Sequence, residues 1–207
     1  MTTYDDIHLL NRDLLLKDHA VFLGDKAFLE FGVYKGVSMK MWYSLYEKHK
    51  LAIDFIGFDS FKGLPSEEID KNSFWKSGDF NANGLINPEL HKDGIRMVVG
   101  YYDQSLNEDA VKLLGNKKVG LVHMDCDTYS STKTVWEWLL KYNILAKGAL
   151  IVYDDWGAYR EAKCDEYDIG EAKAHKEIEE KYGIKLTLVH QYIVDVLFYE
   201  VKVYQYD

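Results

Sequence analysis

LEFGVYKGVS, residues 29–38, gives the clearest indication of the fold class of this chain. An apolar run ends in it, two glycines follow four residues apart, and a helical pattern begins after the second one. A strand that enters a helix through Gly32 and Gly36 is typical of open α/β sheets, where the backbone of such a turn approaches a ligand. The spacing is not G-x-G-x-x-G, so the standard dinucleotide fingerprint is absent. The turn alone also allows a tight strand-to-helix connection without a ligand.

Short apolar runs alternate with longer amphipathic stretches on both sides of this turn, which is the pattern of strands and helices wound into a mostly parallel sheet. The pattern predicts helices over 3–18, 36–48, 107–114 and 131–142, and strands over 27–31, 52–58, 97–99, 119–124 and 149–153.

The C-terminal part departs from this alternation. A charged helix over 169–182 is followed by strand-like runs over 185–190 and 193–204, with only Gln191 and Tyr192 between the runs. A connection that short allows only a hairpin, so one strand at this end must be antiparallel. The sequence therefore predicts a Rossmann-like α/β fold with a seven-stranded, mostly parallel sheet, a C-terminal antiparallel hairpin strand and helices on both faces.

Length and charge limit the organisation and the partners. With 207 residues and no repeat or linker, we expect one domain over 1–207, in which 1–25 form a helical cover and 60–95 form a lid or substrate loop. A net charge of −9 argues against nucleic acid as a partner. The chain shows neither a membrane-spanning run nor a signal-peptide pattern, and its two cysteines are too few for a disulfide framework, so we expect a cytoplasmic protein.

The glycine turn offers groups that suit an amino-acid-like ligand. The amides at the helix start and the Ser38 hydroxyl can hold a carboxylate, and Glu30 at the strand end can accept from an ammonium group. Asp59 ends the next strand, at a distance from the turn that suits an acid gripping ribose hydroxyls. Asp59 could equally cap the following turn.

Two further strands end in acidic residues. Asp125 and Asp127 follow the strand over 119–124, and Asp154 and Asp155 follow the strand over 149–153. Neighbouring parallel strands would bring these carboxylates to one edge of the sheet, where they repel one another unless a cation is present. Oxygen ligands suit Mg²⁺ or a similar ion, and Asp125, Asp154 and Asp155 are the expected ligand set. The alternative is that these acids cap turns and helix starts.

Four motifs in this order, E-x-G-V-Y-x-G-x-S, G-F-D-S-F-x-G-L-P, H-M-D-C-D-x-Y-x-S-T and V-Y-D-D-W, resemble those of the macrocin O-methyltransferase family. That family is metal-dependent and uses S-adenosylmethionine to methylate sugar hydroxyls, and its architecture is that of class I methyltransferases. The resemblance implies that the methionine part of the cofactor lies at the glycine turn, the ribose at Asp59 and the adenine at the turn after the third strand. The implied cofactor-binding residues are Glu30, Phe31, Gly32, Tyr34, Gly36, Ser38, Asp59, Ser60, Gly100, Tyr101 and Asp125.

The same resemblance implies the chemistry and the acceptor. The more distant catechol O-methyltransferases carry a lysine base, but its place falls near Thr128 here, so Asp125 or Asp127 would take the acceptor proton. The implied acceptor is a small molecule, a sugar with adjacent hydroxyls that can chelate the metal through two oxygens. Phe74, Trp75, Trp156 and Tyr159 are candidate walls for such a ring, or else packing residues. A homodimer is the expected assembly.

Other functions fit parts of the sequence. Asp125-Cys126-Asp127-Thr128 matches the D-x-D-x-T motif of haloacid-dehalogenase-like phosphatases, although that assignment leaves 29–38 unexplained and places the nucleophile strand late. A zinc hydrolase based on His123, or a nucleophilic Cys126, lacks the necessary partner residues. A domain that binds S-adenosylmethionine without turnover, acting as a partner subunit, is the non-enzymatic alternative.

Overall fold

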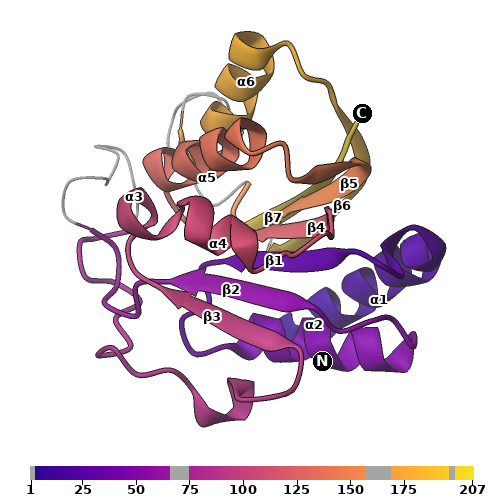
Figure 1. Ribbon diagram of the computed structural model, residues 1–207, viewed down its shortest axis with the longest axis horizontal. Helices are drawn as coiled ribbons and strands as arrows, with labels where there is room; N and C mark the ends of the chain where they lie inside the picture. The colour runs from indigo at the N-terminus through magenta and orange to yellow at the C-terminus, as the bar shows by residue number, and fades with distance from the viewer. Residues whose placement is uncertain (1–2, 66–74, 157–168, 196–198) are drawn as a thin grey trace.

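The computed structural model describes residues 3–65, 75–156, 169–195 and 199–207. Figure 1 shows a central twisted sheet with helices on both sides. The elements in chain order are α1 (Tyr4–Leu23), β1 (Ala27–Phe31), α2 (Val37–Lys48), β2 (Phe55–Asp59), the 3₁₀ helix η1 (Pro88–Leu90), β3 (Ile95–Val99), α3 (Tyr102–Ser105), α4 (Glu108–Lys112), β4 (Val119–Met124), α5 (Tyr129–Lys141), β5 (Leu145–Tyr153), α6 (Gly170–Tyr182), β6 (Leu186–Asp195) and β7 (Tyr199–Tyr206).

The seven strands form one sheet in the order β3-β2-β1-β4-β5-β7-β6. The first five strands in this order are parallel to one another, and β7 is antiparallel to both β5 and β6. The order reverses between β1 and β4, and in open α/β sheets this switch point is where ligands bind, outside the carboxyl ends of the strands. The predicted fold class is confirmed.

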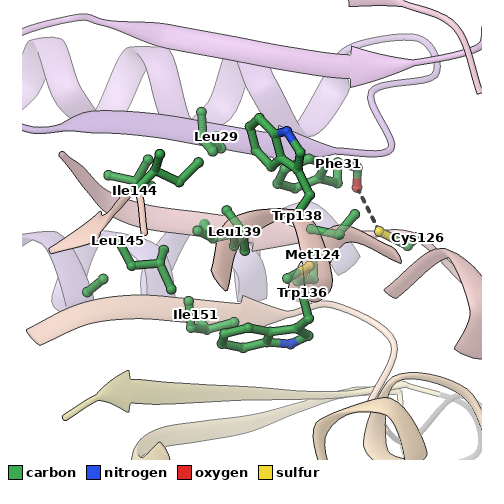
Figure 2. Close-up of a cluster of buried hydrophobic side chains, with 14 of the residues drawn as sticks. Leu29, Phe31, Met124, Cys126, Trp136, Trp138, Leu139, Ile144, Leu145 and Ile151 are labelled. Carbon is green, nitrogen blue, oxygen red and sulfur yellow. Dashed lines mark hydrogen bonds between the residues drawn. The ribbon is translucent and has the colours of Figure 1, made fainter. Parts of the chain in front are cut away.

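Alternate side chains of the buried strands build two cores, one on each face of the sheet. On one face, Phe28 of β1 and Val152 of β5 pack under α1 and α2. On the other face, Phe31 of β1 and Met124 of β4 pack under α4, α5 and α6, and α5 contributes Trp136 and Trp138 to this core. Figure 2 shows this second core and the contact between the Cys126 thiol and the Phe31 carbonyl. Burial on both faces explains why these strands read as continuous apolar runs.

The boundaries of several elements differ from the predicted ones; β5, for example, begins at Leu145, four residues before its predicted start. α1 continues to Leu23, five residues beyond its predicted end, and the short helix α3 was not predicted. The predicted hairpin turn at Gln191–Tyr192 is wrong, because β6 runs through both residues, which pair with Lys202 and Val201 of β7. The register of β6 shifts between Leu188 and His190 and between Ile193 and Asp195, on either side of the predicted turn. Among the described helices, none is long and apolar enough to cross a membrane.

Candidate active site

The turn between β1 and α2 lies at the switch point, and its glycines are required by contacts within the chain. Gly32 has φ +92°, and a Cβ atom there would lie 1.7 Å from the Asp125 carbonyl oxygen at the end of β4. Gly36 precedes α2 with φ +75°, and a Cβ there would lie 2.5 Å from the Leu90 side chain. The ends of β1 and β4 therefore approach more closely than any side chain at Gly32 would allow.

Asp59 braces this turn from the neighbouring strand. Its Oδ2 accepts hydrogen bonds from the amides of Val33 at 2.8 Å and Tyr34 at 2.7 Å, and its Oδ1 accepts from the Phe61 amide. The carboxylate thus compensates the amide dipoles of a turn in which Tyr34 itself has a positive φ of 48°. Asp59 has a structural task here in addition to any contact with a ribose.

A cavity of about 310 Å³ opens at this edge of the sheet. It joins the glycine turn to the ends of β2, β3, β4 and β5, as the sequence predicts for a cofactor and an acceptor that meet. The residues proposed from the sequence that line it are Gly32, Tyr34, Ser38, Asp59, Ser60, Trp75, Gly100, Tyr101, Asp125, Asp127, Asp154 and Asp155.

Several other predicted site residues lie outside this lining. Glu30 is completely buried under α1 and α2, and Phe31 stacks on Phe58 in the opposite core. The Leu90 side chain packs directly against Gly36. Trp156 packs against Tyr204 in the core behind the acidic edge, so the structure does not present it as a wall for an acceptor. Tyr159 and Phe74 lie outside the described residues.

The predicted acidic edge forms, in two overlapping groups that share Asp125. Ligand atoms of Asp125, Asp127 and Asp155 lie within 4.8 Å of one another, and so do those of His123, Asp125 and Asp154. Asp154 and Asp155, adjacent in sequence, thus fall into different groups because their side chains leave the strand end in different directions. Asp127 adopts a left-handed conformation, φ +60°, in the turn that brings it back to Asp125.

The carboxyl groups of Asp125, Asp127 and Asp155 resist ionisation. Burial, followed by the charges of the neighbouring acids, raises the pKa values of Asp125, Asp127 and Asp155 well above their usual range. Glu171, at the start of α6, adds a fourth buried acid whose pKa is raised by burial and by Asp155. Its Oε2 accepts from the Asp155 amide at 3.1 Å. Such a cluster is what a divalent cation would neutralise.

Asp154 sits in a different environment, because a cation of the chain already accompanies it. Arg12 of α1 is 3% exposed, and its Nη2 lies 3.0 Å from Asp154 Oδ1 and 3.1 Å from His123 Nε2. Its Nη1 donates to Ser38 Oγ at 2.8 Å. Burial opposes ionisation, but the His123 hydrogen bond, His8 and the Arg12 guanidinium hold the pKa of Asp154 far below its usual range.

Cys126, the nucleophile candidate, is placed unfavourably, whereas His123 is a buried member of the second acidic group. Burial raises the pKa of the Cys126 thiol well above its usual value, and Sγ contacts the Phe31 carbonyl and the Tyr102 hydroxyl. His123 is fully buried, and burial together with Arg12 lowers its pKa to about 4. A protonated thiol beside a carbonyl is a poor nucleophile, so Cys126 serves packing.

Sequence reasoning missed the residues that reach the edge from distant helices. Arg12 and His8 come from α1, which was predicted only as a cover, and Glu171 comes from the start of α6. The available signal was one arginine on the otherwise apolar face of the first helix, four residues after a histidine. Residues four positions apart lie on the same face of a helix, so the side chains of His8 and Arg12 are expected to point the same way.

Known proteins agree with this geometry. A family model described as a methyltransferase domain matches residues 29–156, which include the glycine turn and every acid of the two groups. This chain belongs to that methyltransferase family. The match removes the basis for the phosphatase alternative, and the predicted methyltransferase identity is confirmed at the level of the family. No curated protein sequence matches the chain.

Solved structures of methyltransferases share the fold of this family member. The O-methyltransferase NovP has a TM-score of 0.69 and 18% identity, over 97% of this chain and 79% of NovP. The calicheamicin methyltransferase CalS11 has a TM-score of 0.67 and 18% identity, over 96% of this chain and 78% of CalS11. TomG of Streptomyces achromogenes, an O-methyltransferase of tomaymycin synthesis solved in complex with S-adenosylmethionine, has a TM-score of 0.54 and 14% identity over 94% and 78%.

Proposed function

We propose that this methyltransferase transfers the methyl group of S-adenosylmethionine to a hydroxyl of a sugar or a glycosylated small molecule, with the help of a divalent cation such as Mg²⁺. The observation that carries the proposal is one cavity lined both by the glycine turn and by the group of Asp125, Asp127 and Asp155. A donor site and an acidic site that share a cavity suit a reaction in which an acceptor hydroxyl must meet a methyl donor. The macrocin-type motifs support the sugar as acceptor.

The cofactor's three parts find suitable groups along the cavity. Amides at the start of α2 and the Ser38 hydroxyl are the groups for the methionine carboxylate. Asp59 ends β2 and Ser60 follows it, at the place where a ribose would need hydrogen-bond acceptors. Asp59 Oδ1 accepts one hydrogen bond, from the Phe61 amide, and has a second lone pair for a ribose hydroxyl. Gly100 and Tyr101, after β3, border the same cavity and suit a flat adenine ring.

The residues of the acidic edge fit a divalent cation, because three buried carboxyl groups whose charges repel one another converge there. A cation bound there would lower the pKa of an acceptor hydroxyl and fix its orientation. Asp125 belongs to both groups and is the central ligand of the proposal, with Asp155 and with Asp127 or Asp154 as the third carboxylate. Asp125 or Asp127 is then placed to hold the acceptor proton.

The acceptor would lie against the loop over 60–95. Trp75, Phe80 and Tyr34 line the cavity together, with ring centroids 4.9 Å apart for Trp75 and Phe80 and 5.6 Å apart for Tyr34 and Phe80. An aromatic wall of this kind suits the apolar face of a sugar ring. Within the proposal, the described part of this loop is the substrate element of a single catalytic domain. The homodimer and the cytoplasmic location stay predictions.

An acceptor screen with isotopically labelled S-adenosylmethionine tests the proposal. It begins with deoxysugars that carry adjacent hydroxyls, in the presence of Mg²⁺ or of EDTA, and calorimetry measures cofactor binding by the same preparation. We expect cofactor binding in both conditions and labelled product only with Mg²⁺. Binding without transfer to any acceptor would favour the non-enzymatic binding domain. Absence of cofactor binding would refute the proposal.

A further inference from the structure

The backbone ladder between β4 and β5 ends just before the acidic edge. Met124 is the last residue of β4 in register with β5, and its carbonyl accepts a hydrogen bond from the Asp154 amide at 2.9 Å. Asp125 follows the end of β4, and Asp155 lies two residues after the end of β5. The pairing of the two strands alone therefore does not fix how far Asp155 lies from Asp125.

The side chain of Glu171 makes contact where this ladder ends. Glu171 lies in the first turn of α6 and is 1% exposed. Its Oε2 accepts a hydrogen bond from the Asp155 amide at 3.1 Å. Burial and the charge of Asp155 raise the pKa of Glu171, and hydrogen bonds from the amides of Asp155 and Cys126 oppose this rise. One side chain of α6 thus serves buried amides on the segments after both strands, which need an acceptor.

Glu171 stands behind the acidic edge. The cavity is lined by Asp125, Asp127 and Asp155, and among the described residues Glu171 is not part of this lining. Its Oε1 is buried and has no hydrogen-bond partner in the described part of the chain. The dipole of α6 favours a carboxylate in its first turn, which offsets part of the cost of burying that oxygen. Glu171 can therefore influence the site through the two amides without contact with a bound ligand.

We propose that Glu171 is a positioning residue, which accepts from the amides of Asp155 and Cys126 and so holds the ends of β4 and β5 where Asp125 and Asp155 converge. The inference rests on the proposed function only for the cation that these two acids would share. Glu171 lies outside residues 29–156, which the family model matches. The start of α6 is thus a part of the site that the motifs of the chain do not include.

Amide hydrogen exchange of the metal-free protein, followed by NMR, tests the two hydrogen bonds. Glu171→Asp keeps the charge but withdraws the acceptor by one methylene, so the amides of Cys126 and Asp155 should exchange at least about tenfold faster, relative to amides within β4 of the same variant. Glu171→Gln keeps the length and an accepting oxygen, and it should stay within about threefold of the wild type. Ile178→Val is the matched control, because it removes one methylene from a fully buried side chain of the same helix.

Mn²⁺ affinity, measured by electron paramagnetic resonance, tests the consequence for the site. Glu171→Asp should bind Mn²⁺ at least about tenfold more weakly than the wild type, because residues that orient metal ligands commonly contribute that much. Glu171→Gln and Ile178→Val should stay within about threefold. The affinity for S-adenosylhomocysteine should change less, since Asp59 braces the glycine turn independently of α6.

The reverse order of the two variants, with the loss in Glu171→Gln and none in Glu171→Asp, would show that Glu171 acts by its charge and would overturn the proposal. An equal loss in Ile178→Val would overturn it as well, because general loosening of α6 would then explain the effect.

The wild type separates this proposal from the proposed function. If it binds no Mn²⁺, the cation part of the proposed function fails, and hydrogen exchange still decides the role of Glu171. Faster exchange in Glu171→Asp would then support the positioning role, and unchanged exchange would overturn it. If the wild type binds Mn²⁺ while Glu171→Asp exchanges as slowly as the wild type, the Glu171 proposal fails and the proposed function stands.

Discussion

Single residues set the geometry of this edge of the sheet, and Gly32 does so most directly. We expect Gly32→Ala to destabilise the protein by more than about 3 kcal/mol, because its Cβ would lie 1.7 Å from the Asp125 carbonyl oxygen. Gly115 also has a positive φ, but a Cβ there meets nothing within 4 Å, so Gly115→Ala should cost only about 1 to 2 kcal/mol. Urea unfolding measures both, and equal losses would contradict this explanation of Gly32.

His175 of α6 makes the stability depend on pH. It is 4% exposed among Tyr153, Trp156 and Tyr204, and burial together with Lys202 lowers its pKa to about 4, although the half-exposed Glu179 lies 3.4 Å away. Between pH 6.5 and 4 the unfolded state therefore binds the extra proton, and stability falls as the pH falls. From pH 7 to pH 5 this residue should account for a loss of about 2 kcal/mol.

Unfolding of a His175→Gln variant at both pH values measures this share. The variant should lose less stability than the wild type on acidification, while the buried His123, whose pKa is also about 4, continues to contribute in both proteins. An equal loss in the variant and the wild type would show that His175 is not the titrating group.

At the scale of elements, the N-terminal helix is part of the core and of the site. Leu16 of α1 is fully buried against the sheet, whereas Leu10 on the same helix is 60% exposed. Leu16→Ala should cost about 2 to 5 kcal/mol of stability, and Leu10→Ala should change it by less than about 0.5 kcal/mol. Thermal unfolding of both variants checks the packing of α1, and a Leu16→Ala variant as stable as the wild type would show that α1 is not docked as described.

Elements with a strong local pattern were predictable, and contacts between distant elements were not. The predicted bounds of β1 and β4 match the structure, because both are short apolar runs that end at a clear turn signal, Gly32 or Asp125. The hairpin was misplaced because Gln191 and Tyr192 separate two apolar runs in the sequence, whereas their pairing with β7, which no local pattern reveals, keeps both inside β6. Arg12 and Glu171 escaped prediction for the same reason, since only the packing of α1 and α6 brings them to the acids of β4 and β5.

For the whole molecule, the sheet order concentrates the chemistry at one edge. The switch point between β1 and β4 brings the glycine turn beside Asp125, and the parallel strand β5 adds Asp154 and Asp155. A ligand that binds only the folded protein stabilises it by mass action, by about 2.7 kcal/mol at a hundred times its dissociation constant. We expect S-adenosylhomocysteine and Mg²⁺ each to raise the melting temperature, and no shift with either ligand would contradict the shared site.

Diffraction from crystals soaked with S-adenosylhomocysteine and Mn²⁺, collected at the manganese absorption edge, would locate the cation and the cofactor together. We expect one anomalous peak within coordination distance of Asp125 and Asp155, beside cofactor density that runs from the glycine turn to Gly100. An anomalous peak elsewhere, or cofactor density away from the glycine turn, would contradict it.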